Sequence, residues 1–151
     1  MRLQLALNVD DLDAAIDFYT KLFGEAPAKV KPGYANWAIE NPPLKLVIFE
    51  GAGEHGTINH LGVETETAEE VVAADRRMRE AGLETTGIDE TQCCFAEKTE
   101  TWVTGVDGHQ WEFYVKHADV EQFTNVSFGN VALGSKTDAS DRGNGSVCCP
   151  S

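Results

Sequence analysis

Two adjacent cysteines, Cys93 and Cys94, carry the most distinctive chemistry in this chain. Consecutive Cα atoms lie about 3.8 Å apart, closer than the roughly 4.4–6.8 Å of an unstrained disulfide. The pair is therefore predicted to remain as two thiols whose sulfurs can close on one soft metal or metalloid atom. A second pair, Cys148 and Cys149, lies close to the C-terminus, and the two pairs account for all four cysteines.

The local conformation of the first pair decides whether both sulfurs can reach one atom. Neighbours on a regular strand point to opposite faces of a sheet, so on a strand only one of the two could face a cavity. The alternative role is that of small apolar fillers. The sequence near residues 93–96 has a strand pattern, but shared binding by Cys93 and Cys94 requires a loop or a bulge, and that is the conformation we expect.

Length and charge exclude several classes of function. A chain of 151 residues is long enough for one well-buried domain. Its formal net charge of −13 argues against nucleic acid and anionic membranes as partners. No apolar run reaches the roughly 18 residues of a membrane span. The N-terminus has no signal-peptide pattern. The lack of this pattern and the expected reduced thiols together predict a cytoplasmic protein.

Hydrophobic periodicity and capping residues outline the elements that must position these side chains. In the first half, a strand precedes a helix that ends at Gly24, and two strands follow. In the second half, a strand precedes a helix that begins at the Thr67/Glu70 capping box, and three strands follow. The predicted ranges are strands 3–9, 34–39, 44–49, 58–64, 93–96, 101–104 and 110–116, and helices 12–23 and 68–81.

The two halves repeat one unit, with an offset of 60 − 4 = 56 between their first strands. The repeat predicts an α+β fold of two tandem βαβββ modules, about residues 1–52 and 57–117. These modules are expected to form one curled, barrel-like mixed sheet with the helices outside. Residues 118–151 are expected to be an extension and a flexible polar tail that ends in the second cysteine pair.

The repeat also selects candidate metal ligands. Gln4 and His60 occupy the same position on the first strands, and Lys45 and Glu112 are aligned on the last strands. A pseudo-twofold axis between the modules would bring all four together. Gln4, His60 and Glu112 can bind a metal, whereas protonated Lys45 cannot. His60 taken alone is more often a structural histidine, but Glu112 inside a barrel must be paired or metal-bound. Three N,O ligands with open positions suit Fe(II) or another borderline divalent ion.

The chain resembles the vicinal oxygen chelate superfamily, which includes glyoxalase I, extradiol dioxygenases and bleomycin-resistance proteins. Within it, the chain looks most like the carbon–arsenic lyases and the cadmium-induced proteins. The resemblance covers about residues 1–117. It is carried by residues 5–12, 18–24, 32–36, 42–47, 89–94 and 105–115.

This resemblance implies a specific reaction. Cys93 and Cys94 would hold the As(III) of a trivalent organoarsenical such as methylarsenite or an aromatic arsenical. Fe(II) on Gln4, His60 and Glu112 would bind O₂, and cleavage of the C–As bond would release arsenite. The dioxygenases of the superfamily usually have His where this chain has Gln4, whereas Gln is expected from the resemblance to carbon–arsenic lyases. Ni, Co, Mn or Zn are the other ions for such a site.

Two other functions fit part of the sequence. One is a thiol-based protein that sequesters cadmium or arsenic without catalysis, which does not need Gln4, His60 and Glu112. The other is an extradiol-type dioxygenase or isomerase acting on a carbon substrate, which does not need vicinal thiols. For Cys148 and Cys149 the sequence leaves two roles open: accessory metalloid binding that delivers arsenic to the site, or a free tail that picks up stray metal. The sequence leaves open whether the modules pair within one chain or across a homodimer.

Overall fold

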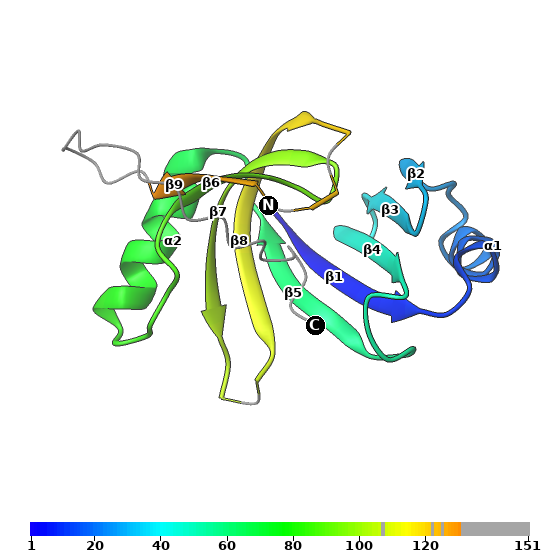
Figure 1. Ribbon diagram of the computed structural model, residues 1–151, viewed down its shortest axis with the longest axis horizontal. Coiled ribbons are helices and arrows are strands. Elements are labelled where there is room, and N and C mark those ends of the chain that lie inside the picture. The colour runs from blue at the N-terminus through cyan, green and yellow to red at the C-terminus, as the bar shows by residue number, and fades with distance from the viewer. Residues whose placement is uncertain (107, 122, 125, 131–151) are drawn as a thin grey trace.

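The computed structural model describes residues 1–106, 108–121, 123–124 and 126–130. This part of the chain contains nine strands and two helices, which Figure 1 shows. They are β1 (Arg2–Val9), α1 (Leu12–Phe23), β2 (Lys29–Lys31), β3 (Tyr34–Ile39), β4 (Leu44–Glu50), β5 (Ile58–Glu64), α2 (Ala68–Glu80), β6 (Asp89–Cys93), β7 (Ala96–Thr104), β8 (Gln110–Asp119) and β9 (Val126–Asn130).

All nine strands belong to one mixed sheet, in the order β2-β3-β4-β1-β5-β8-β7-β6-β9. β1 pairs with β4 in parallel, β5 pairs with β8 in parallel, and β1 and β5 pair antiparallel at the centre. Leu5 lies directly opposite Leu61 across that central pair. These two positions differ by 61 − 5 = 56, the repeat offset, so the pseudo-twofold axis passes between them. The predicted α+β fold is confirmed, and both modules belong to one chain.

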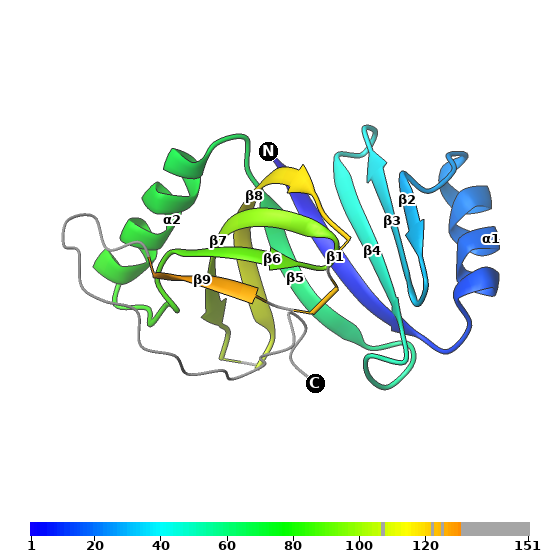
Figure 2. The same ribbon diagram turned by 45° about the horizontal axis from the view of Figure 1, so that its top comes forward.

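The sheet curls, and the helices cover its outer face at opposite ends (Figure 2). Along β1, Gln4, Ala6 and Asn8 are buried on the concave side. Leu5 and Leu7 alternate with them and pack with α1 on the convex side. This period of two is what allows a polar concave face and an apolar outer face on the same strand.

The helix ends follow the predicted capping chemistry. Asp11 caps α1 by accepting a hydrogen bond from the Ala14 amide, and Gly24 ends the helix with φ of 71°. At α2, Thr67 and Glu70 form the capping box. Neither helix of the described chain has the length and apolar character that a transmembrane helix needs.

The cysteine segment differs from the predicted strand at residues 93–96. β6 ends at Cys93, which pairs with Ala96 of β7, so Cys94 and Phe95 form a two-residue hairpin loop. Both loop residues have positive φ, 50° and 63°, as a type I′ hairpin turn requires. The strand prediction was therefore wrong for Cys94 and Phe95 and correct for Cys93 and Ala96. The expectation of a loop is confirmed at Cys94, whereas Cys93 is the last residue of β6.

The alignment of the two last strands also needs correction. Leu46 lies beside Leu5, and Trp111 lies beside Leu61, because of the parallel pairings. The position equivalent to Glu112 is therefore Val47 rather than Lys45. A shift of two residues keeps a side chain on the same face of the sheet, so Lys45 still faces the concave side, next to Gln4.

A buried carboxylate joins α2 to the sheet. Asp75 accepts hydrogen bonds from the hydroxyls of Thr85 (2.6 Å) and Thr101 (2.9 Å) and pairs with Arg79 at 2.9 Å. Burial alone would raise the pKa of Asp75, but the two hydroxyls and Arg79 outweigh it and lower the pKa. Its contribution to stability is therefore present above the unfolded pKa of about 3.9 and is lost as pH falls through the lower folded pKa.

We expect Asp75→Asn to lower the free energy of unfolding at pH 7 by about 1–3 kcal/mol, because it removes a charged acceptor from buried donors. Urea denaturation at pH 7 and pH 2.5 measures this. The difference from wild type should shrink at pH 2.5, because stability contributed by a carboxyl with a lowered folded pKa falls once the pH is below its unfolded pKa. A difference that is the same at both pH values contradicts the assignment, and the exposed Asp17→Asn serves as the control.

Candidate metal and substrate site

Three neighbouring strands bring the predicted ligands Gln4, His60 and Glu112 together. Gln4 on β1 lies opposite Gly62 on β5, and Gly62 lies beside Glu112 on β8. Because Gly62 has no side chain, the two flanking side chains can meet above it. His60 lies two residues before Gly62 and so points to the same face. All three side chains are buried, with exposed fractions of 6% for Gln4, 4% for His60 and 1% for Glu112.

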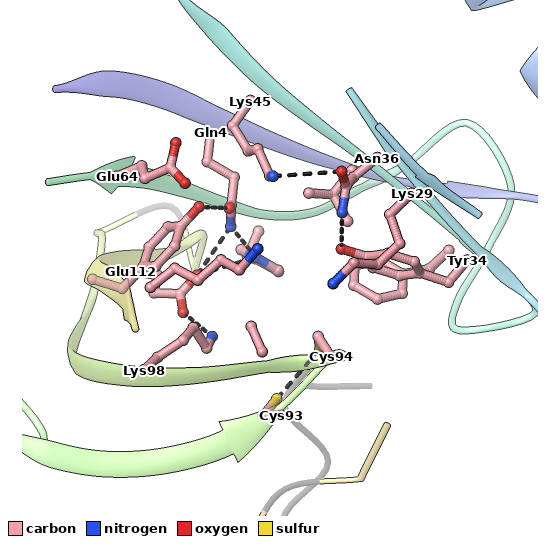
Figure 3. A pocket seen from close by; sticks show the side chains of 16 residues that line it. Gln4, Lys29, Tyr34, Asn36, Lys45, Glu64, Cys93, Cys94, Lys98 and Glu112 are labelled. Atoms are coloured by element: carbon pink, nitrogen blue, oxygen red, sulfur yellow. Dashed lines mark hydrogen bonds and ion pairs between the residues drawn. The ribbon is translucent and has the colours of Figure 1, made fainter. Parts of the chain in front are cut away.

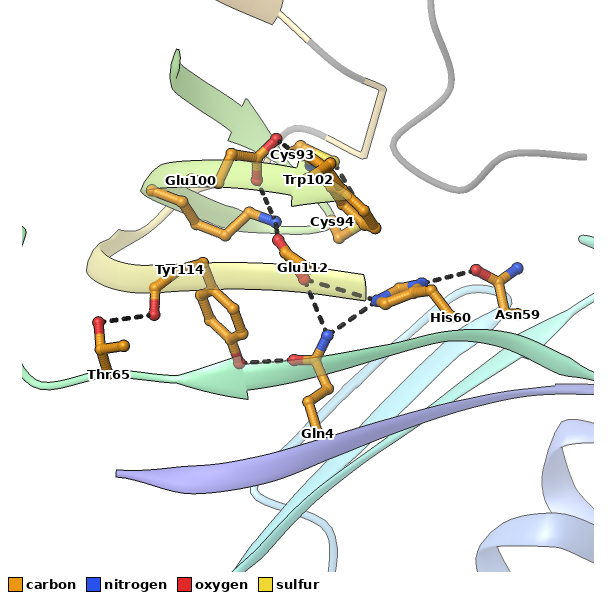
Figure 4. A network of polar contacts seen from close by, with 11 residues as sticks. Gln4, Asn59, His60, Thr65, Cys93, Cys94, Glu100, Trp102, Glu112 and Tyr114 are labelled. Carbon is orange, nitrogen blue, oxygen red and sulfur yellow. Dashed lines mark hydrogen bonds and ion pairs between the residues drawn. The ribbon is translucent and has the colours of Figure 1, made fainter. Parts of the chain in front are cut away.

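The polar atoms of the three side chains converge on one point (Figure 4). Gln4 Nε2 lies 2.8 Å from His60 Nε2 and 2.9 Å from Glu112 Oε2, and the latter two atoms are 3.6 Å apart. Ligands at right angles around an ion about 2.1 Å away stand roughly 3 Å apart. The Gln4 atom in these distances is the amide nitrogen, which cannot bind a metal, so the spacing fits a divalent ion with the amide turned to place Oε1 there. No group of three His, Cys, Asp or Glu side chains forms a metal site within the described residues, and the third side chain beside His60 and Glu112 is the Gln4 amide.

The orientation of His60 suits a metal ligand. Asn59 Oδ1 lies 2.8 Å from His60 Nδ1. An amide oxygen can only accept, so this contact places the ring proton on Nδ1. The lone pair of Nε2 then faces Gln4 and Glu112. Asn59 is itself held by a hydrogen bond from its Nδ2 to Asn8 Oδ1 (2.9 Å). Such outer contacts fix the tautomer and the ring orientation of metal-binding histidines.

We expect Asn59→Leu to weaken metal binding by about 10- to 100-fold, because it removes the acceptor that fixes the His60 tautomer. Anaerobic titration with Fe(II), followed by calorimetry, measures the affinity. Asn59→Asp is the matched control, since it keeps the acceptor and should bind metal at least as tightly as wild type. Equal affinities for Asn59→Leu and wild type would show that this contact does not orient a ligand.

Tyr114 fixes the amide of Gln4 from the opposite side. Its hydroxyl donates to Gln4 Oε1 at 2.5 Å. Burial and the nearby carboxylates Glu112 and Glu64 raise the pKa of Tyr114 well above its usual value, so the phenol stays protonated. A hydroxyl can donate or accept. It can therefore hold Gln4 both with Oε1 turned toward Tyr114 and with Oε1 turned toward a metal.

Glu112 is also part of a buried ion cluster. Lys98 Nζ binds Glu112 Oε1 and lies 2.8 Å from Glu100 Oε2. Trp102 Nε1 donates to the other Glu100 oxygen at 3.0 Å. Burial alone would raise the pKa of Glu112, but the Lys98 ammonium outweighs it and holds the pKa well below the usual range. Glu112 is therefore ionised, with Oε1 held by Lys98 and Oε2 turned toward Gln4 and His60.

The cysteine pair faces the same cavity. Gln4, His60 and Glu112 line it together with Cys93 and Cys94, and Figure 3 shows the pair at its edge. The two sulfurs lie 3.3 Å apart, too far for a bond between them, which would be about 2.05 Å long. Binding of one soft atom by both sulfurs requires both thiols to be reduced. Cys148 and Cys149 lie outside the described residues.

Sequence reasoning missed four residues of this site. Lys98 and Glu100 lie in a strand whose polar residues suggest exposure, yet both are buried. The signal that could have found them is their spacing, since opposite charges two residues apart on a strand share one face. Asn59 and Tyr114 carry no such signal, because the contacts that matter, with His60 Nδ1 and with Gln4, depend on the tertiary structure.

Comparison with known proteins agrees with this geometry. Residues 3–113 match the family described as Glyoxalase/Bleomycin resistance protein/Dioxygenase superfamily. The chain is 47% identical over 149 residues to a "Trivalent organoarsenical cleaving enzyme" of Thermomonospora curvata, covering 98% of this chain and 99% of that protein. It is 52% identical over 148 residues to the "Cadmium-induced protein CadI" of Mycobacterium bovis, covering 98% and 92%.

A solved structure extends the comparison to the fold. The Mn(II)-bound glyoxalase from Novosphingobium aromaticivorans superposes with a TM-score of 0.55 at 15% identity, covering 79% of this chain and 40% of that chain. At this identity the likeness concerns the fold. The match over residues 3–113, the two relatives of nearly full length and the shared fold lead to one conclusion: the chain belongs to the glyoxalase/bleomycin resistance protein/dioxygenase superfamily.

Proposed function

We propose that this protein is a non-haem Fe(II)-dependent dioxygenase that cleaves the C–As bond of trivalent organoarsenicals and releases arsenite. One observation carries the proposal: a soft sulfur pair and a set of N,O ligands line the same cavity. The name of the Thermomonospora curvata relative supports the substrate class. The sulfurs bind arsenic, and Gln4, His60 and Glu112 hold the iron, which when bound supplies open positions for O₂.

The separation of the sulfurs lets them bind one soft atom together. If each sulfur lies about 2.3 Å from that atom, as in zinc thiolates, their separation of 3.3 Å corresponds to an angle close to 90°. Trivalent arsenic is pyramidal, with angles close to a right angle, and accepts such a pair.

The remaining residues position the reactants. Lys98 holds one oxygen of Glu112, and the other oxygen, turned toward Gln4 and His60, would hold the metal. Lys98 also interacts electrostatically with Cys94, so one buried cation faces both halves of the site. Phe49, Tyr34 and Phe95 form an apolar cluster with Cys93 and keep water from the arsenic side. Holding both reactants in one cavity provides the proximity that the reaction needs.

An overall reaction that balances is methylarsenite plus O₂ giving arsenite plus formaldehyde. Arsenic stays trivalent, the carbon loses four electrons, and O₂ gains them. The two products can be measured separately, and their ratio tests whether cleavage and oxidation of the carbon occur in one turnover.

The test is anaerobic loading of the reduced protein with Fe(II), followed by methylarsenite and air, with arsenic speciation of the products. We expect arsenite from the wild type. Glu112→Gln and Cys94→Ser should each lower kcat/KM by about 100-fold or more, because each removes a group that positions a reactant. Glu54→Gln, in an exposed loop, is the control for loss of one carboxylate.

The rival function is metal sequestration without catalysis, which the "Cadmium-induced protein" relative suggests. If the iron-loaded wild type releases no arsenite but binds Cd(II) with an affinity that depends on Cys94 and not on Glu112, sequestration replaces the proposal. If arsenite forms at the same rate with Cys94→Ser, the assigned role of the sulfur pair is wrong.

A further inference from the structure

The wall of the cavity next to Gln4 is basic, although the chain has a net charge of −13. We call the cavity that Gln4, His60, Glu112 and the cysteine pair line the inner cavity. An outer cavity of about 510 Å³ adjoins it and is lined by four basic and two acidic side chains. The basic residues are Arg2, Lys29, Lys45 and Lys116, and the acidic ones are Glu64 and Asp119. A positive cavity in an acidic protein selects for negative ligands.

Most of these charges are already paired. Arg2 pairs with Glu64. Lys29 and Lys116 both pair with Asp119, the latter at 2.8 Å. Four cations face two carboxylates, a surplus of two positive charges, and Lys45 is the one of the four without an ion pair among the described residues.

Lys45 itself has a weak contact. Its Nζ donates to Asn36 Oδ1 at 3.4 Å, and among the described residues no ion pair joins Lys45 to a carboxylate. Burial lowers the pKa of Lys45. Glu64 opposes that shift, while Lys116, Arg2 and Lys29 add to it. The surroundings of this ammonium thus supply more positive than negative charge.

The place of Lys45 relative to the reaction site is fixed by the sheet. Lys45 on β4 lies beside Gln4 on β1 in the parallel register, and neighbouring strands are about 4.8 Å apart. Figure 3 shows the Lys45 side chain reaching toward Asn36, away from Glu112 and Cys93. Lys45 and Asn36 line both the inner and the outer cavity.

The sizes of the two cavities indicate which part of an organoarsenical would lie beside Lys45. The inner cavity is about 40 Å³, which suits a methyl group on arsenic but not a ring. The outer cavity, at about 510 Å³, is within the range of small-molecule sites. With arsenic at the cysteine pair, the adjoining outer cavity beside Lys45 offers room for a larger organic substituent.

We propose that Lys45, held by Asn36, is a specificity residue that binds an anionic group, a carboxylate or phenolate, on the organic substituent of the arsenical. This inference rests on the proposed function and narrows its substrate class to arsenicals with an acidic substituent, above all aryl arsenicals. The anion would supply the negative partner that Lys45 lacks, through a charge-assisted hydrogen bond in a partly desolvated place.

The kinetic test uses two substrates that differ by one carboxylate, phenylarsenite and 4-carboxyphenylarsenite. Wild type should prefer the carboxylated substrate in kcat/KM. Lys45→Met should lower kcat/KM for that substrate by about tenfold or more, the loss expected for one charged hydrogen bond, and change phenylarsenite by less than about twofold. Lys45→Arg should retain the preference. Lys21→Met, on the exposed face of α1, controls for net charge.

A binding test does not depend on turnover. Titration of the reduced protein with 4-fluorobenzoate, followed by fluorine NMR, should show saturable binding to wild type that Lys45→Met abolishes. If wild type cleaves neither arsenical, the proposed function fails, and this titration still decides whether the subsite exists. The inference is overturned if Lys45→Met binds the benzoate as wild type does, or if wild type cleaves both arsenicals without preference.

Discussion

Lys98→Met is expected to destabilise the protein by about 3–5 kcal/mol at pH 7.5, the cost of removing one partner from a buried ion cluster. Lys98 is the cation that binds both Glu100 and Glu112, and these carboxylates are 3% and 1% exposed. Without it, two negative charges would face each other in a buried site. Urea denaturation of the metal-free protein measures the change.

The effect of pH on this variant has a definite sign. In wild type, burial raises the pKa of Glu100, Lys98 opposes this, and Glu112 adds to it. Removing Lys98 lets the folded-state pKa of both carboxyls rise above the unfolded value of about 4.3. A group whose folded pKa is raised binds a proton more readily when folded, so the penalty is largest at neutral pH and shrinks as pH falls toward 5.

Two controls separate this effect from a general loss of charge. Lys21→Met, whose ion pair with Asp17 is exposed, should change the free energy of unfolding by less than about 1 kcal/mol. Added Mn(II) should stabilise Lys98→Met more than wild type, because a cation on Glu112 replaces the missing charge. A Lys98→Met variant as stable as wild type at pH 7.5 would mean that the cluster is not the charge balance of the site.

Gly62→Ala is expected to weaken metal binding by about tenfold or more and to lower the free energy of unfolding by about 1–3 kcal/mol. A Cβ at Gly62 would lie 2.9 Å from the carbonyl oxygen of Glu112 and 3.5 Å from the Cβ of Gln4. The nearest atom belongs to the backbone of β8, so β5 and β8 would have to separate, and Gln4 and Glu112 would move apart.

Gly24→Ala is a matched control for this variant. Gly24 has φ of 71° and no atom within 4 Å of an added Cβ, so alanine there costs about 1–2 kcal/mol of backbone strain without touching the site. Its metal affinity, measured by the same anaerobic titration, should equal that of wild type. If Gly62→Ala also binds metal as wild type does, the close approach of β5 and β8 is not what sets the spacing of the ligands.

Much of the fold follows from local sequence signals. The caps at Asp11, Gly24 and Thr67 satisfy backbone groups at the helix ends and are visible as residue types. The internal repeat predicted one curled sheet and the meeting of Gln4, His60 and Glu112, because a twofold relation between modules brings equivalent strands together. These features depend on periodicity and capping, which a single sequence displays.

Other features depend on the register between strands and on buried charges that offset one another, and a sequence displays neither. The Cys94-Phe95 turn has positive φ at both residues without the Asn or Gly that usually marks such a turn. The two-residue shift that replaces Lys45 by Val47 as the counterpart of Glu112 changes no hydrophobic pattern. Lys98 and Glu100 are buried because each offsets the charge of its neighbours, a property of the cluster rather than of either residue.

The central pairing of β1 with β5 also bears on how the protein behaves on dilution. Gln4 comes from the first module, and His60, Glu112 and both cysteines come from the second, yet all belong to one chain. A site completed within a single polypeptide does not rely on an encounter between molecules. Under the proposed function, activity per chain is therefore expected to stay constant at concentrations where any association of chains is lost.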